Sequence, residues 1–379
     1  MNQKQMGLYI HIPFCKKKCY YCDFSSYSGM EDYWEPYVDA VVNELAMKAS
    51  EYKNPVIDTV FIGGGTPSLI PQKLIWKLLN AVHKYYRINQ GYENTIEANP
   101  GTLSDDKLQA YKEFGINRIS IGLQACQDDL LNRIGRIHSH KDFLASVELA
   151  QKYGFKNINA DIIFGIPDQS FNQWQETIET IVSLDIPHVS CYSLIIEEDT
   201  MFGKMKKNGE LSEPDEDLDR EMYYYAVETL AQRGFIHYEI SNFAKPNHIC
   251  RHNMNYWRRG HYIGAGAGAH SFIDNRRFAN TSDVVTYIDG VKDEELQLSE
   301  SYDLDTEDAI EEFIFLGIRL EEGIDLALIE REFGINIEAR YRMKIDRLVK
   351  QGLVECKGTL VKLTKQGLDL ANRVILELV

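Results

Sequence analysis

The sequence of 379 residues lacks several features that would place it in other classes of protein. It has no continuous apolar run of about 18 residues, so we expect no stable membrane insertion. It also lacks an excess of basic residues: 41 Lys and Arg stand against 57 Asp and Glu, and the formal charge is −16. A chain this acidic is not expected to bind nucleic acid through diffuse charge attraction.

Targeting signals and paired cysteines are also missing. Met1–Met6 is polar and too short for a secretory signal, so we expect a cytoplasmic protein. The seven cysteines are odd in number, and three of them lie within eight residues. In a reducing compartment this pattern favours metal ligation over disulfide bonds. The oligomeric state stays open, with a homodimer as one alternative.

Short apolar runs alternate with stretches of helical periodicity over the first two-thirds of the chain. The runs predict strands over 8–13, 59–63, 95–99, 118–123, 159–164 and 188–194. The periodic stretches predict helices over 33–49, 73–86, 104–114, 140–153 and 171–184. This alternation predicts an α/β fold with a parallel sheet. An open doubly wound sheet and a complete or partial β/α barrel both fit the spacing.

The remaining third changes in character. We expect a helix over 220–233 and a strand over 237–241, and the segment 247–270 is unusually rich in His, aromatic and Gly residues. The last part predicts helices over 309–319, 326–333, 337–351 and 365–378, with a hairpin over 353–363 before the last helix. That arrangement is typical of a winged helix, although its many glutamates argue against DNA binding. We expect three units, 1–235, 236–300 and 301–379.

The strongest chemical signal is a C-x3-C-x2-C motif formed by Cys15, Cys19 and Cys22. Iron–sulfur clusters and structural zinc sites usually use four protein ligands. His11 and Asp23 are poor candidates for a fourth, so three thiolates imply an open coordination position. A zinc site completed by a distant Cys or His remains the alternative.

Together with other segments, this motif resembles the radical S-adenosylmethionine (SAM) superfamily, and within it the oxygen-independent coproporphyrinogen III oxidase family. The matching segments are YIHIPFC at 9–15, GGGTP at 63–67, IEANP at 96–100, ISIGLQ at 119–124, NRIGR at 132–136 and NADIIFGIP at 159–167. The resemblance implies a partial (β/α)6 barrel of the TIM type, followed by a mainly helical, winged-helix-like domain.

The resemblance also implies cofactors and the residues that bind them. Cys15, Cys19 and Cys22 would each hold one iron of a [4Fe–4S] cluster, and SAM would chelate the fourth iron. Residues at family positions that pack on or contact the cluster or SAM are Tyr9, Tyr21, Gly64, Gly65, Thr66, Glu97, Gln124, Arg136 and Asp161. Two alternatives stay open: Glu97 as a solvated carboxylate, and Arg136 with Asp161 as an interior ion pair.

The sequence departs from the oxidase pattern in three places. Phe24 stands where the oxidase carries a further cysteine, and only eight residues precede Tyr9 where the oxidase has a longer arm. The third departure is HNMNYW at 252–257, an H-N-x-x-Y-W motif that resembles the heme-chaperone branch of the family. Heme suits a histidine ligand among aromatic side chains, so His252 is the expected axial ligand. Alternatives are His248, Cys250, His261 and His270.

The preferred hypothesis is a heme chaperone that passes heme to acceptor hemoproteins and carries a [4Fe–4S] cluster with exchangeable SAM. Arg251, Arg258 and Arg259 are candidate partners of the heme propionates. The scaffold is expected to be able to cleave SAM. One alternative is the oxidase itself, which decarboxylates propionate side chains of coproporphyrinogen III to vinyl groups. The other is a radical SAM enzyme with an unrelated substrate.

Overall fold

The structure is a computed structural model, and it describes residues 5–212 and 214–379. The polar amino-terminal segment predicted over 1–6 therefore lies mostly outside the described residues. Within the described part of the chain, no helix is long and apolar enough to cross a lipid bilayer.

Six parallel strands form the centre of a twelve-stranded sheet. They are β1 (Gln5–Ile12), β2 (Val56–Gly64), β3 (Arg87–Ala98), β4 (Arg118–Gln124), β5 (Asn157–Phe164) and β6 (His188–Ser193). The crossover helices are α1 (Trp34–Glu51), α2 (Gln72–Tyr85), α3 (Asp105–Glu113), α4 (Asp128–Arg133), α5 (His140–Lys152) and α6 (Phe171–Ser183). All the predicted strands and helices of this region are confirmed; the short α4 was not predicted.

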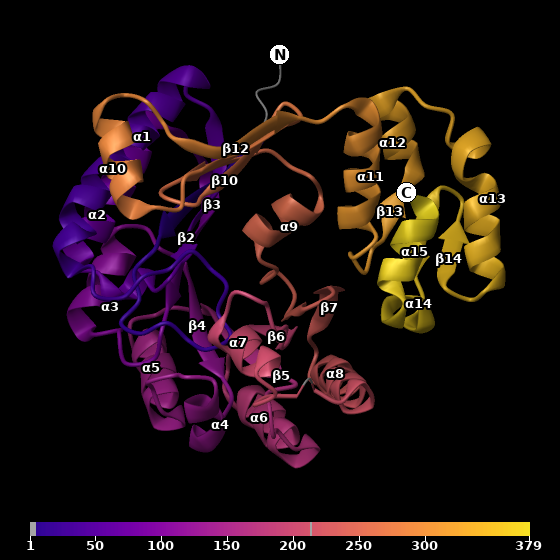
Figure 1. Cartoon of the computed structure of the whole chain (residues 1–379), viewed down its shortest axis with the longest axis horizontal. Helices are drawn as coiled ribbons and strands as arrows, with labels where there is room; N and C mark the ends of the chain where they lie inside the picture. Colours follow the sequence, from indigo (N-terminus) through magenta and orange to yellow (C-terminus); the bar gives the residue numbers. More distant parts are fainter. Residues whose placement is uncertain (1–4, 213) are drawn as a thin grey trace.

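The strand order decides between the two closures that the sequence left open. β1 to β6 lie side by side in chain order, and each neighbouring pair is parallel. Right-handed crossovers between strands in chain order put all the helices on one face of the sheet. Figure 1 shows these helices on the outside, with the strands inside. The predicted partial barrel is therefore confirmed.

Side chains alternate along the barrel strands. On β4, Ile119, Ile121 and Leu123 belong to the hydrophobic core, whereas Ser120 and Gln124 line a cavity. Because successive strand residues point to opposite faces, the apolar set packs beneath the helices and the polar set faces the barrel interior. The interior is thus equipped for binding polar ligands.

The middle of the chain extends the sheet at both edges. Its elements are α7 (Met201–Lys207), α8 (Glu216–Gln232), β7 (Ile236–Glu239), β8 (Asn242–Ala244), α9 (Arg251–Trp257), β9 (Tyr262–Ala265), β10 (His270–Ile273), β11 (Arg276–Asn280), α10 (Val284–Lys292) and β12 (Leu298–Asp303). β8 pairs antiparallel with β6, and β9 pairs parallel with β1. The segment 247–270, rich in His, aromatic and Gly residues, thus contains α9 and β9 and ends where β10 begins.

A buried ion pair fastens this extension to the barrel. Glu44 and Lys48 on α1 are 2.7 Å apart and almost fully buried. Lys48 Nζ donates to the carbonyl of Gly264 at 2.7 Å, and Glu44 Oε2 accepts from the backbone N–H of Gly266 at 2.7 Å. Gly266 has φ +106°, and a Cβ there would lie 2.6 Å from the carbonyl oxygen of His11. Glycine is therefore required at this close approach.

The carboxyl-terminal unit has its own sheet and its own hydrophobic cluster. Its elements are α11 (Thr306–Gly317), β13 (Ile324–Asp325), α12 (Leu326–Phe333), α13 (Ile337–Lys350), β14 (Val354–Lys357), β15 (Leu360–Leu363), α14 (Lys365–Asp369) and α15 (Ala371–Leu378). Three helices and the hairpin are as predicted. The single last helix was wrong, because Leu370 leaves helical geometry, with φ −114° and ψ 27°, and separates α14 from α15.

Candidate functional site

The cysteine motif lies in a loop that follows β1, at the carboxyl end of the sheet. Backbone hydrogen bonds close the base of this loop: Cys15 N donates to Tyr27 O at 2.8 Å, and Tyr27 N donates to Pro13 O at 2.7 Å. At its far side, Tyr20 N donates to Ile134 O at 3.0 Å, just past α4. The loop is thus held to the barrel at two points and turned over its end.

Eleven of the thirteen predicted site residues line one cavity of about 400 Å³ beneath this loop. They are Cys15, Cys19, Tyr21, Cys22, Gly64, Gly65, Thr66, Glu97, Gln124, Arg136 and Asp161. The volume of this cavity is within the range of sites for small molecules. Tyr9 and His252 lie elsewhere. We call this space the cysteine cavity; the binding roles of its residues stay predictions.

The three thiols are half-buried and have polar neighbours. Cys15 Sγ lies 3.6 Å from Thr66 Oγ1, and Arg136 Nη1 donates toward Cys19 Sγ at 3.6 Å. Among the described residues, no three His, Cys, Asp or Glu side chains lie close enough to share a single metal ion. A cluster of four irons differs, because each thiolate binds a separate iron.

The glycine run after β2 forms one wall of the cysteine cavity. Gly64 has φ +115°, and a Cβ there would lie 2.6 Å from the His11 ring. A Cβ on Gly65 would lie 2.7 Å from the carbonyl oxygen of Phe14. Only glycines allow this loop to pack against β1 and present its backbone to the cavity.

Glu97 ends β3 and faces the same wall. Its Oε2 accepts a hydrogen bond from the backbone N–H of Gly64 at 3.0 Å. Burial, and second the nearby charge of Asp161, raise the pKa of Glu97 to about 8. Glu97 is half-buried and lines the cavity, so its role there stays a prediction. A half-buried carboxyl group with a raised pKa is suited to a cationic partner.

Arg136 and Asp161 have separate partners, so the structure does not pair them as an interior ion pair. Arg136 Nη2 donates to Gly122 O and to Asn99 Oδ1, both at 2.8 Å. Asp161 accepts from Ser120 Oγ at 2.9 Å and from Asn159 Nδ2 at 2.8 Å. Burial raises the pKa of Asp161, and these hydrogen bonds oppose the shift.

Asn99 is a residue of this site that sequence reasoning missed. Its Nδ2 donates to Thr66 Oγ1 at 2.9 Å while its Oδ1 accepts from Arg136, so it joins two walls of the cavity. The available signal was its place in the segment at 96–100, as the last residue of a predicted strand. Gln124 has φ +74° where the register of β4 against β5 shifts, which aims its side chain at the cavity.

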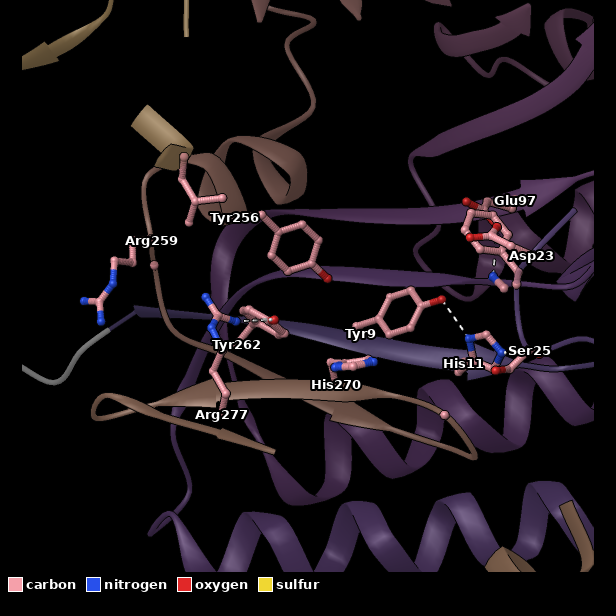
Figure 2. A pocket seen from close by; sticks show the side chains of 15 residues that line it. Tyr9, His11, Asp23, Ser25, Glu97, Tyr256, Arg259, Tyr262, His270 and Arg277 are labelled. Carbon is pink, nitrogen blue, oxygen red and sulfur yellow. Dashed lines mark hydrogen bonds between the residues drawn. The ribbon is translucent and has the colours of Figure 1, made fainter. Parts of the chain in front are cut away.

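A second cavity, of about 530 Å³, adjoins the first (Figure 2). It has aromatic and cationic walls, so we call it the aromatic cavity. Its walls include Tyr9, Tyr256, Arg259, Tyr262, His270 and Arg277. Asp23, Phe24, Gly64 and Glu97 line both cavities. Tyr9 donates to His11 Nδ1 at 2.9 Å, and His11 Nε2 donates to Ser25 O at 2.9 Å, which fixes a neutral His11.

Two of the three conspicuous side chains of the H-N-x-x-Y-W motif, His252 and Tyr256, lie on one face of α9, whereas Trp257 points elsewhere. His252 is 1% exposed, and its Nδ1 and Nε2 are hydrogen-bonded to Thr59 Oγ1 at 2.8 Å and Tyr256 Oη at 2.7 Å. Tyr256 lines the aromatic cavity. Trp257 lines a separate cavity of about 750 Å³ with Arg319 and Tyr192.

Neither ring nitrogen of His252 is therefore open to iron in this arrangement. Burial lowers the pKa of His252 to about 3, so the ring is neutral. Cys250 is also buried, and burial raises the pKa of its thiol to about 12. His248 Nδ1 bonds to Pro246 O at 3.0 Å, whereas His270 lines the aromatic cavity.

Two family models match separate segments of the chain, and individual relatives match nearly its full length. A family model described as the Radical SAM superfamily matches residues 9–181, and one described as the HemN C-terminal domain matches residues 304–370. Heme chaperone HemW of Bacillus subtilis (strain 168) is 37% identical, over 97% of each chain. Heme chaperone HemW of Escherichia coli (strain K12) is 35% identical, over 93% of this chain and 92% of its own.

The fold has a solved counterpart. Coproporphyrinogen III oxidase (HemN) from Escherichia coli matches with a TM-score of 0.86, covering 99% of this chain and 90% of its own. At 21% identity this likeness shows the fold alone. The partial barrel and its cysteine-bearing loop define a radical SAM protein. Within that class, the chain belongs to the heme chaperone HemW family.

Proposed function

We propose that the chain binds heme and passes it to acceptor hemoproteins, on a scaffold that holds a [4Fe–4S] cluster and exchangeable SAM. The observation that carries this proposal is similarity over nearly the whole chain to proteins named heme chaperones. A cytoplasmic location belongs to the same proposal, because three thiols in one loop need a reducing compartment. We also propose 1–235, 236–300 and 301–379 as its functional units.

Cys15, Cys19 and Cys22 are the proposed cluster ligands. They share one loop and one cavity, and Arg136 beside Cys19 offsets negative charge on thiolate ligands. When bound, the cluster supplies the electron that cleaves the SAM sulfonium. The lysines at 16–18 add positive charge to the same loop.

The proposed SAM contacts come from the opposite wall. Backbone at Gly64 and Gly65 allows the ligand to approach closely, and Glu97 offers a carboxylate to its cationic end. Asn99 bonds to both Thr66 and Arg136 and so holds these two side chains in place at the cavity wall. These residues bind and orient the ligand; the chain's own contribution is position and exclusion of water.

The oxidase is the second candidate, favoured by its matching fold. Phe24, which is 60% exposed, stands where the oxidase pattern has a further cysteine. A side chain without a thiol cannot supply the chemistry of that cysteine, so the chaperone is the better-supported function.

One anaerobic experiment separates the two. Reconstituted protein is incubated with SAM, a strong reductant and coproporphyrinogen III, and the tetrapyrrole products are identified by mass spectrometry. In parallel, hemin-loaded protein is mixed with apomyoglobin, and heme transfer is followed by absorbance. We expect intact coproporphyrinogen and transfer of heme. A decarboxylated product without heme transfer would make the chain an oxidase.

A further inference from the structure

The aromatic cavity has the walls that a large flat anionic ligand requires. Tyr9 from β1, Tyr256 from α9 and Tyr262 from β9 contribute aromatic surface, and Leu316 from α11 closes one side. Tyr256 and Tyr262 pack edge to face with ring centroids 4.6 Å apart. Aromatic walls with a few convergent polar groups are typical of sites for organic ligands.

His270 brings a coordinating nitrogen to this cavity. It begins β10, its side chain is 64% exposed, and its Nδ1 lies 3.2 Å from Glu300 Oε1. A carboxylate at this distance holds the proton on Nδ1, which leaves the Nε2 lone pair for a metal. Histidines that bind metals commonly donate their other N–H to a carboxylate in this way. Figure 2 shows His270 and Tyr9 directed into the same space.

Two arginines at the other end of the cavity converge on one carboxylate. Arg259 Nε donates to Glu312 Oε2 at 2.7 Å, and Arg277 Nε donates to Glu312 Oε1 at 2.5 Å. Arg277 also donates to Tyr262 Oη at 3.1 Å (Figure 2). The Arg259 side chain is 4% exposed, so this anion site is built into the protein interior. Guanidinium pairs of this kind bind carboxylates strongly.

The hairpin places the nitrogen ligand and the anion site at a fixed separation. β10 and β11 pair antiparallel, with Phe272 opposite Arg277 and His270 opposite Ala279. His270 and Arg277 are therefore diagonal neighbours, and such pairs lie about 7–8 Å apart on one face of a sheet. Heme has iron at its centre and carboxylates at its edge. It therefore needs a ligand for the iron and, some distance away on the same face, a cation for a carboxylate.

We propose that the aromatic cavity is the heme site, with His270 as the iron ligand and with Arg259 and Arg277 binding a propionate that takes the place of the Glu312 carboxylate. This inference rests on the proposed function, since it assigns a location to the heme. Glu312 lies on α11 of the carboxyl-terminal unit, so occupation of the site by a ligand exchanges a contact between the two parts of the chain. Four side chains carry the proposal, and His252 is not one of them.

The test uses the full chain and hemin as the probe, with binding followed by the Soret band and by magnetic circular dichroism. His270→Ala is expected to shift the Soret band and raise the hemin Kd by about tenfold or more. His83→Ala is the matched control, because His83 is an exposed histidine on the outer helix α2. It should leave band and Kd unchanged.

A replacement of the ligand gives a positive signal that a structural role would not produce. His270→Cys should convert the spectrum to that of a thiolate-bound heme. An unchanged spectrum and Kd in both His270 variants, with hemin still bound, would overturn the assignment of the site but leave the proposed function standing. Absence of hemin binding by the unaltered chain would instead contradict the proposed function.

The exchange of carboxylates is tested in the opposite direction. Glu312→Gln frees the two arginines from an internal anion and should lower the hemin Kd by about threefold or more. Glu322→Gln is the control, because Glu322 pairs at 2.8 Å with Arg258 outside the cavity. A hemin Kd that rises in Glu312→Gln, in protein with an unchanged circular dichroism spectrum, would refute the exchange.

Discussion

The carboxylate of Glu97 at the end of β3 accepts a hydrogen bond from the backbone N–H of Gly64 at the end of β2, at 3.0 Å. Glu97 lines the cysteine cavity, the aromatic cavity and a third, polar cavity of about 170 Å³. It is therefore a titratable group common to all three. A ligand that changes the charge on Glu97 changes the electrostatics of each cavity.

The affinity for SAM should increase with pH through the titration of Glu97. Its pKa of about 8 means that most of the carboxyl groups are protonated at pH 7 in the free protein. A cationic ligand favours the carboxylate, so binding near pH 7 should release protons. Calorimetry in buffers of different ionisation enthalpy measures that release. Other charged or titratable groups that interact with Glu97 include Asp161, Arg118, Tyr9, Tyr192 and Tyr256.

Glu97→Gln should remove most of the pH dependence, lower the SAM affinity and leave the iron content unchanged. Glu113→Gln, an exposed change on α3, is the control.

The pH dependence of stability has the opposite sign to that of SAM binding. Folding raises the pKa of Glu97, so the contribution of Glu97 to the free energy of unfolding falls as the pH rises from about 4.5 to about 8. Equal loss of iron and SAM in Glu97→Gln would make the residue structural.

Cys19→Ala should abolish cluster assembly, because two thiolates do not hold a four-iron cluster in an exposed loop. Iron and sulfide content after anaerobic reconstitution should fall to near zero, and the circular dichroism spectrum should be retained. Cys356→Ala is the control, since Cys356 is exposed on β14, far along the chain from the loop. A full complement of iron and sulfide in Cys19→Ala would overturn the cluster assignment.

Local patterns predicted the parallel α/β sheet because each strand carries its own signal, whereas the choice of a partial barrel came from the family resemblance. Apolar residues at alternate positions, such as Ile119 and Ile121, bury one face, and residues after the strand ends carry the chemistry. These are local properties. The family resemblance, in turn, assigned Glu97, Asp161 and the cysteines to one site, and the structure brings them to one cavity.

The motif alone does not show whether a histidine is open to a ligand, because that depends on tertiary contacts. His252 bonds to Thr59, which is 193 positions away in the chain, and to Tyr256 one turn along α9. His270 faces a cavity whose walls come from β1, α9 and α11. The break at Leu370 and the separate partners of Arg136 and Asp161 depend on packing in the same way.

His252→Ala should destabilise the protein. The change leaves the hydroxyls of Thr59 and Tyr256 without their partner in a buried place, and such losses cost about 1–3 kcal/mol. Chemical denaturation measures the free energy of unfolding, with His83→Ala as a surface control. A free energy of unfolding equal to that of the unaltered chain would show that the two hydrogen bonds contribute nothing to stability.

The pair of Glu44 and Lys48 should be the most sensitive point of the sheet extension. Lys48→Ala leaves the carboxylate of Glu44 buried without its cation, and breaking a buried pair costs about 3–5 kcal/mol. Lys73→Ala breaks a comparable pair with Glu35 on the surface, 3.7 Å long, and should cost less than about 1 kcal/mol.

Combining Lys48→Met with Glu44→Gln tests the reason for that difference. The double variant has no buried charge, so it should recover part of the stability lost in Lys48→Ala. Because Glu44 and Lys48 hold Gly264 and Gly266 ahead of His270, the single variant should also raise the hemin Kd. A Lys48→Ala protein as stable as Lys73→Ala would mean that the strand is held by its backbone pairing with β1, and that the ion pair is dispensable.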